Sequence, residues 1–178
     1  MRLFVAICLP PAAKAALDRG IAALRQQGRG TFTRTENLHL TLAFIGETTR
    51  GKDAARALRE VQAPAFSLTL TGCGCFGNLI WAGAELTQEL EQLQVQVTRA
   101  LERTDFALDT KAFRPHLTLC RRFVPETRLD RRALEQALGT TTFPVDEIHL
   151  MNSERLNGKL TYTSIFTQPL LPGQEEHT

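Results

Sequence analysis

The tetrapeptide His-Leu-Thr-Leu occurs twice in this sequence, at residues 39–42 and again at residues 116–119. A second copy of a four-residue string is rare by chance in a chain of 178 residues, so it indicates an internal repeat with an offset of 77 positions. A structural repeat should align the flanking helices and strands as well. The repeat restricts the possible folds more than any other feature of the sequence does.

The two halves of the chain show the same predicted order of elements: a strand, a helix, a histidine-bearing strand, a helix and a strand. In both first helices, apolar residues recur at the spacing of an amphipathic helix. In chain order, the aligned pairs are 3–6 with 80–83, 11–27 with 88–104, 39–42 with 116–119, 52–61 with 129–138, and 66–70 with 143–147. A last predicted strand, at 160–167, has no counterpart at this offset and must join one of the sheets.

We therefore predict an α+β fold with two similar lobes related by an approximate two-fold axis, each with a mainly antiparallel sheet and helices. The repeats cover 1–78 and 79–155, with the boundary near Asn78 and a closing strand near 160–167. A half of ~80 residues is too small to be stable alone. We expect residues 1–178 to form a single bilobal domain.

Composition excludes several other classes of protein. Hydrophobic residues make up 43% and charged residues 22%, as in globular domains rather than disordered or coiled-coil chains. No apolar run approaches the ~20 residues that span a bilayer, so we expect no membrane partner. The net charge of +2 is too small for a protein that holds nucleic acid by charge alone.

The four cysteines do not predict a metal site. Only Cys73 and Cys75 are close in sequence, and no second pair of ligands has the spacing of a zinc site. Cys8 and Cys120 lie in apolar strands, where we expect both to be buried. The N-terminal apolar run is too short for a signal peptide, so we expect a cytoplasmic protein. The polar tail at 172–178 is expected to be frayed.

The repeated strands place histidine and threonine on the same face, because side chains alternate between the two faces of a strand. These residues are His39 and Thr41 in the first copy, and His116 and Thr118 in the second. A solvent-exposed strand face would explain a single copy. Two lobes related by a two-fold axis would bring the equivalent faces together, so we predict that the four side chains meet at one site.

The residue types of this site suit the cleavage of a phosphodiester without a metal or other cofactor. Histidine has an unperturbed pKa near neutrality, so one imidazole can act as a base while the other acts as an acid. Threonine hydroxyls can donate hydrogen bonds to phosphate oxygens. A nearby arginine would stabilise the negative charge that develops on those oxygens.

These residues carry a family resemblance. The two His-x-Thr-x motifs, together with the stretches 2–6, 36–46 and 113–121, resemble the 2H phosphoesterase superfamily. Within it, the chain is most similar to the RNA 2′,3′-cyclic phosphodiesterases, which are also described as 2′-5′ RNA ligases. The resemblance implies a bilobal fold with a central cleft. It also implies hydrolysis of RNA 2′,3′-cyclic phosphate ends to 2′-phosphomonoesters without a metal.

The same resemblance implies a role for each motif residue. His39 would be the proton donor and His116 the proton acceptor, while Thr41 and Thr118 would bind the phosphate. The family's phosphate-binding arginine, five positions after the second histidine, falls on Arg121.

The pattern of the second strand does not decide which arginine binds the phosphate. Strict alternation places Arg122 on the face of His116 and Arg121 in the core, where a charge is costly. Either the strand ends or bulges after Leu119 and Arg121 binds phosphate, or Arg122 does. We favour Arg121 on the resemblance.

Two other functions remain possible. The same site could form a 2′-5′ bond in the reverse direction, or the chain could be a non-catalytic RNA- or nucleotide-binding module. The expected partners are RNA with 2′,3′-cyclic phosphate ends or related small nucleotides, bound by a monomer.

A structural role is the simplest explanation for several further residues. His149 has no partner at the repeat offset and is expected on a strand surface. Trp81 could stack on a base and Phe44 could meet a base at the rim of the cleft, but both are expected in the core. The segment 72–77 lacks a following lysine or helix start, so it does not resemble a phosphate-binding loop. We interpret it as a flexible turn that ends the first lobe.

Overall fold

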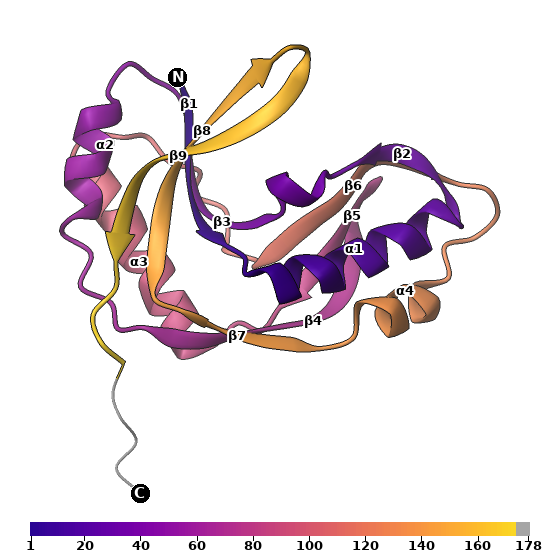
Figure 1. Ribbon diagram of the computed structural model, residues 1–178. Helices are drawn as coiled ribbons and strands as arrows, with labels where there is room; N and C mark the ends of the chain where they lie inside the picture. The colour runs from indigo at the N-terminus through magenta and orange to yellow at the C-terminus, as the bar shows by residue number, and fades with distance from the viewer. Residues whose placement is uncertain (174–178) are drawn as a thin grey trace, which may run out of the picture.

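A computed structural model describes residues 1–173 as two antiparallel sheets with four α-helices (Figure 1). The first sheet has the strand order β3-β1-β8-β9, and these strands are His39–Glu47, Arg2–Cys8, Glu147–Leu156 and Lys159–Pro169. The second has the order β2-β6-β5-β4-β7, formed by Gly28–Phe32, His116–Pro125, Leu79–Ala84, Phe66–Phe76 and Thr141–Val145. The predicted α+β class with two antiparallel sheets is confirmed. Most of the tail that was predicted to be frayed, 174–178, lies outside the described residues.

The helices begin and end close to the predicted positions. They are α1 (Pro11–Arg25), α2 (Gly51–Leu58), α3 (Gln88–Glu102) and α4 (Arg131–Leu138), with a short 3₁₀ turn, η1, at Thr35–Asn37. Pro11 suits the first turn of α1, where its missing N–H is not needed. The hydroxyl of Thr87 caps α3 by accepting a hydrogen bond from the Leu90 N–H. Among the described residues, no helix is long and apolar enough to cross a membrane.

The sheets do not follow the two halves of the sequence. Strands β1 and β3 come from the first half, but they share their sheet with β8 and β9 from the second half. Strands β5, β6 and β7 of the second half share theirs with β2 and β4 of the first. The helices do not follow the two halves of the sequence either. Helix α1 packs on the second sheet beside α4, whereas α3 lies against β3 and α2 (Figure 1). The predicted closing strand pairs with β8, and runs from Lys159 to Pro169.

The core explains the alternation in the repeated strands. Leu40 and Leu42 of β3, and Leu117 and Leu119 of β6, are almost fully buried in one hydrophobic cluster that continues through both sheets. The histidines and threonines between them are half-buried on the opposite face. Burial of the leucines therefore fixes which face of each strand is left for the polar residues.

The glycine-rich segment at 72–77 is not a flexible turn, and that expectation is wrong. Strand β4 continues through this segment to Phe76, and only Gly77 and Asn78 form the turn to β5. Gly72 has a φ of 76° at an irregularity in the pairing with β5, where a residue with a side chain would be strained. The indole of Trp81 packs closely on Gly74, which leaves no room there for a β-carbon.

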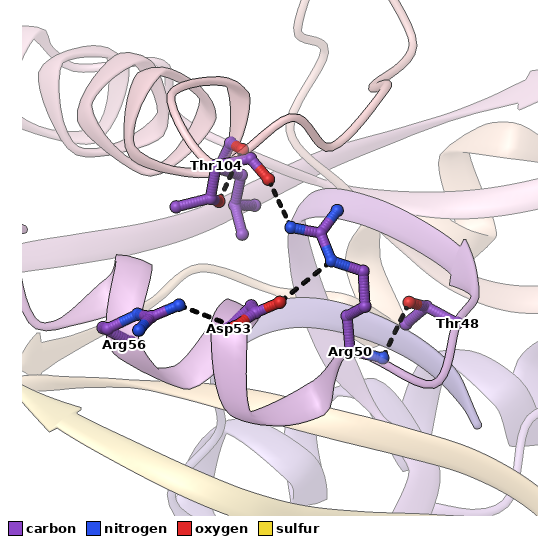
Figure 2. A network of polar contacts seen from close by, with 6 residues as sticks. Thr48, Arg50, Asp53, Arg56 and Thr104 are labelled. Carbon is purple, nitrogen blue, oxygen red and sulfur yellow. Dashed lines mark hydrogen bonds and ion pairs between the residues drawn. The ribbon is translucent and has the colours of Figure 1, made fainter.

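A polar network joins α2 to the chain that follows α3 (Figure 2). The guanidinium of Arg50 donates to a carboxylate oxygen of Asp53 at 2.9 Å and to the carbonyl oxygen of Thr104 at 2.7 Å. The same guanidinium lies 4.6 Å from the ring centroid of Phe106. Arg56 pairs with the other oxygen of Asp53. Arg50 therefore anchors the start of the long segment between α3 and β6.

Candidate active site

The two repeated motifs meet because β3 and β6, which belong to different sheets, lie against each other. Thr41 from β3 and His116 from β6 line the same cavity. His39 is close enough to His116 for the charge of one ring to influence the other. The structure thus brings the two motifs together where the sheets meet, with Thr41 and His116 in the wall of one cavity and His39 beside Thr41.

Each histidine ring is held by a main-chain carbonyl two positions earlier in the chain. Nδ1–H of His39 donates to the carbonyl oxygen of Asn37, and Nδ1–H of His116 donates to that of Arg114, both at 2.7 Å. A carbonyl oxygen can only accept, so Nδ1 carries the proton in each neutral ring. The unprotonated nitrogen is then Nε2 in both, which is the atom available for proton transfer.

Aromatic rings surround the two imidazoles in a similar way. The ring of Phe4 lies 4.8 Å and that of Tyr162 5.1 Å from the centroid of His39. His116 has Phe76 at 5.1 Å and Trp81 at 6.4 Å. Both Tyr162 and Phe76 present nearly perpendicular rings to the histidines. These contacts limit the rotation of each imidazole.

The threonines have unequal surroundings. The hydroxyl oxygen of Thr41 lies 3.0 Å from Nε2 of His39, so it can donate to the neutral ring or accept from the charged one. Thr118 is half-buried on the same face as His116, and its carbonyl oxygen accepts a hydrogen bond from the hydroxyl of Thr33 at 2.8 Å. This contact secures β6 against the segment that follows β2.

Asn37 anchors the first motif, although its residue type gave no functional signal. Its side chain is 6% exposed and donates to the carbonyl oxygen of Leu160 in β9 at 2.9 Å. The 77-residue offset pairs Asn37 with Arg114, and each provides the carbonyl for its histidine. The repeated feature is therefore a main-chain position, which residue types do not reveal.

Burial lowers the pKa of His39, because it removes water from around the charged imidazole. The hydrogen bond to the Asn37 carbonyl opposes this effect, while the positive charges of Arg121 and His116 lower the pKa further. In the free protein the neutral form of His39 is therefore favoured over a wider pH range than in an exposed histidine.

A bulge in β6 decides the position of the two arginines. On β5, the neighbours Ile80 and Trp81 pair with Cys120 and Thr118, so Leu119 is an extra residue in β6. Cys120 is consequently buried, as predicted, and Arg121 is exposed. The charge of Arg121 acts on His39 across the cleft.

Arg122 has a different environment. Its φ is 53°, and its guanidinium donates to the hydroxyl of Thr31 in β2 at 2.9 Å. Of the two arginines, only Arg121 contributes to the shift in the pKa of His39. Strict alternation of side chains fails after Leu119 because of the bulge.

A cavity of about 660 Å³ extends from the motifs along β3 and α3. Its wall includes Phe44, which is 46% exposed, so the expectation that Phe44 belongs to the core is wrong. On β1, the neighbours Val5 and Ala6 pair with Ala43 and Thr41, so Leu42 is an extra residue in β3 and strict alternation fails there. Ala43 is consequently buried, and Phe44 faces away from the core. Trp81 is half-buried beside Phe76 and His116.

Other candidate residues lie apart from this cavity. His149 is on the strand surface as expected, with Nδ1 near the hydroxyls of Ser164 and Thr167 and Nε2 3.1 Å from Glu147. Cys8 is exposed at the end of β1, so its expected burial is wrong. Within residues 1–173, no group of three or more histidine, cysteine or acidic side chains could hold a metal ion.

Comparisons with known proteins identify the same superfamily that the two motifs resemble. The family model of the 2′-5′ RNA ligase superfamily matches residues 10–157. The RNA 2′,3′-cyclic phosphodiesterase of Geobacillus stearothermophilus is 34% identical over 98% of this chain, which spans 59% of the length of that relative. The RNA 2′,3′-cyclic phosphodiesterase of Escherichia coli is 32% identical over 67% of this chain and 71% of its own.

Solved structures resemble the whole fold. E. coli LigT in its apo form has a TM-score of 0.80 at 26% identity, covering 96% of this chain and 97% of its own. A protein of Thermus thermophilus has a TM-score of 0.79 at 26% identity, covering 98% of this chain and all of its own. LigT has also been solved with 3′-AMP, at a TM-score of 0.79 and 27% identity, covering 95% of this chain and 97% of its own.

Proposed function

The chain belongs to the 2′-5′ RNA ligase superfamily, and we propose that it is a metal-independent RNA 2′,3′-cyclic phosphodiesterase that produces 2′-phosphomonoesters. One observation carries this proposal: two imidazoles are each fixed through Nδ1 to a carbonyl oxygen, with His116 in the wall of the cavity and Nε2 of His39 3.0 Å from the hydroxyl of Thr41 in that wall. Acid–base catalysis of phosphodiester hydrolysis needs two such imidazoles.

In this mechanism His116 takes a proton from water through Nε2, and the water oxygen attacks the phosphorus atom. The bond between phosphorus and the 3′ oxygen breaks, and Nε2–H of His39 gives its proton to that oxygen. The products are a 2′-phosphate and a free 3′-hydroxyl. His39 must be charged at this point, and the negative charge of the bound phosphate would favour the imidazolium that burial disfavours.

Thr41, Thr118 and Arg121 are proposed to bind the non-bridging phosphate oxygens. Hydroxyl donors and a guanidinium stabilise charge that grows on these oxygens in the transition state. Two observations support Arg121 over Arg122 for this role. The bulge in β6 moves Arg121 out of the core, and the Arg122 guanidinium already donates to Thr31. We also propose that the protein acts as a monomer in the cytoplasm.

The test is to hydrolyse a nucleoside 2′,3′-cyclic phosphate with chelator-treated protein and to identify the product by phosphorus NMR. A 2′-phosphate, a bell-shaped pH–rate profile, and a loss of about 10²- to 10⁴-fold in kcat in both His39→Ala and His116→Ala would support the proposal. Full activity of either variant would exclude the assigned proton transfers, and a 3′-phosphate product would reverse them. Binding without turnover would indicate a nucleotide-binding module instead.

Formation of a 2′-5′ bond is the second candidate, because the family match names ligation. The same two histidines would exchange their roles in the reverse reaction. Initial rates measured in both directions with the same RNA ends decide which reaction the site favours.

A further inference from the structure

The cavity beside the motifs is larger than a phosphate group requires. Its volume is about 660 Å³, and Thr41 and His116 lie in its wall, so a ligand there would be continuous with the proposed phosphate site. Pockets of this size hold small organic molecules with most of their surface buried. The unit attached to the phosphate of the proposed substrate is a nucleoside.

Two aromatic side chains line the cavity from different sheets. Phe44 belongs to β3 and Phe76 to the end of β4, and their exposed fractions are 46% and 39%. Large apolar side chains that are exposed together often mark a binding site. Rings of this kind can stack on nucleobases of any type, so they explain affinity for a base but not a choice among bases.

Two polar side chains of α3 also line the cavity. They are Gln94 and Thr98, which lie one helical turn apart. Nε2 of Gln94 donates to the carbonyl oxygen of Leu42 at 3.4 Å and to the hydroxyl oxygen of Thr98 at 3.1 Å. The Leu42 carbonyl can only accept, so it fixes which end of the Gln94 amide carries nitrogen.

These bonds leave a defined pair of groups free. Both amide hydrogens of Gln94 are used, and its Oε1 remains as an acceptor. The Thr98 oxygen accepts from Gln94, so its own hydroxyl hydrogen remains as a donor. The cavity therefore offers an acceptor next to a donor.

We propose that this cavity holds the 3′-terminal nucleobase and selects cytosine and adenine over uracil and guanine. This inference rests on the proposed function. Cytosine and adenine present an amino donor next to an unprotonated ring nitrogen, which complements Gln94 Oε1 and the Thr98 hydroxyl. Uracil and guanine present a carbonyl acceptor next to a ring N–H donor. With the base held where cytosine or adenine would bind, their carbonyl would face Gln94 Oε1 without a proton between them, and a buried polar group left unpaired is strongly disfavoured. Uracil could pair its N3–H and O2 with these two groups only by shifting one ring position, away from the place that its ribose and phosphate set.

The test compares the cytidine and uridine 2′,3′-cyclic phosphates, which differ only at this edge of the base. We expect kcat/KM to favour cytidine by about tenfold in the unmodified protein. Gln94→Met removes the acceptor at similar length and should bring the ratio to about one. Gln92→Met is the matched control, because Gln92 is an exposed residue of α3 that does not line the cavity. A ratio of one in the unmodified protein, or an unchanged ratio in Gln94→Met, overturns the inference.

Calorimetric binding of 3′-CMP and 3′-UMP separates this inference from the proposed function. If neither cyclic nucleotide is hydrolysed, the proposed function fails, yet tighter binding of 3′-CMP that is lost in Gln94→Met still supports the selectivity. Phe44→Ala should weaken both nucleotides about fivefold or more without changing their ratio. Ile165→Ala, at an exposed side chain outside the cavity, should change neither. Unchanged affinity in Phe44→Ala places the base elsewhere and overturns the inference.

Discussion

Arg121 and His39 belong to different sheets, yet the charge of Arg121 lowers the pKa of the His39 imidazole. This relationship depends on the bulge that places Leu119 outside the pairing of β6 with β5. It couples a proposed phosphate-binding group to a proposed proton donor before any substrate is present.

Arg121→Gln should therefore raise the pKa of His39. In the unmodified protein we expect the pKa of His39 to lie below 6.5, the value of an ordinary histidine, because burial and the positive charges of Arg121 and His116 all disfavour the imidazolium. NMR titration of the histidine ring signals measures this directly. Arg122→Gln is the control, since Arg122 does not contribute to the shift. An equal shift in both variants would show that the effect is not specific to Arg121.

The same pKa predicts how stability depends on pH. The unfolded chain protonates His39 near pH 6.5, whereas the folded protein resists protonation until a lower pH. Between these values the unfolded state binds more protons, so this residue lowers the free energy of unfolding as the pH falls below about 6.5. Urea titrations should show that the stability difference between the unmodified protein and His39→Gln is constant above pH 7 and changes in favour of the variant at pH 5. A difference that stays constant to pH 5 would contradict the prediction.

Asn37→Ala should reduce kcat by loosening His39. The substitution leaves the Leu160 carbonyl without its partner and should cost about 1–3 kcal/mol of stability. It also frees the chain whose carbonyl holds His39 Nδ1, so we expect kcat to fall about tenfold while KM changes little. Nitrogen NMR of the His39 ring would show a mixture of tautomers. Asn78→Ala, in the exposed turn before β5, should leave the tautomer and kcat unchanged.

Arg50→Ala should destabilise the protein by about 1–2 kcal/mol, because it removes a charge-assisted bond to the Thr104 carbonyl and the stacking on Phe106. Arg56→Ala is a matched control within the same network (Figure 2). Arg56 makes only an exposed ion pair with Asp53, which is worth about 0.5 kcal/mol or less. Thermal unfolding of the two variants measures both effects. Equal destabilisation would mean that Asp53, rather than the bond to Thr104, carries the network.

Gly74→Ala should displace the only tryptophan. A β-carbon at this position would overlap the Trp81 indole, and the added strain should cost about 1–3 kcal/mol. Because Trp81 lies near His116, the rate of hydrolysis should fall too, and tryptophan fluorescence should shift. In a Trp81→Leu background the same glycine substitution should be tolerated, which a double-mutant cycle would detect as coupling. Additive effects would show that the two residues do not clash.

The sequence was sufficient to predict the strands that meet at the cleft. Alternation placed His39 and Thr41 opposite buried leucines, and the repeat offset aligned Phe4 with Trp81, which both lie beside a histidine of the neighbouring strand. These features depend on local patterns of two to four residues, which the sequence displays directly.

Long-range packing set the features that the sequence did not predict. The offset aligns the start of β4 with 143–147, where β7 ends and β8 begins, but it does not show that β8 joins the other sheet. Gly74 belongs to a strand in which it pairs with Trp81, whose indole covers it. The exposure of Phe44 follows from the irregular pairing of β3 with β1 at Leu42, which the alternation in the sequence does not reveal.

The exchange of strands and helices has a mechanical consequence. A hinge that opened the cleft would have to separate the sheet of β3 from the sheet of β6. The connections into β4 and β8 cross between those sheets, and β4 and β8 are hydrogen-bonded on both sides. We propose that the chain unfolds as one cooperative unit and that its halves cannot be separated without breaking both sheets. The crossing connections therefore restrain the separation of β3 from β6, and with it the separation of His39 from His116.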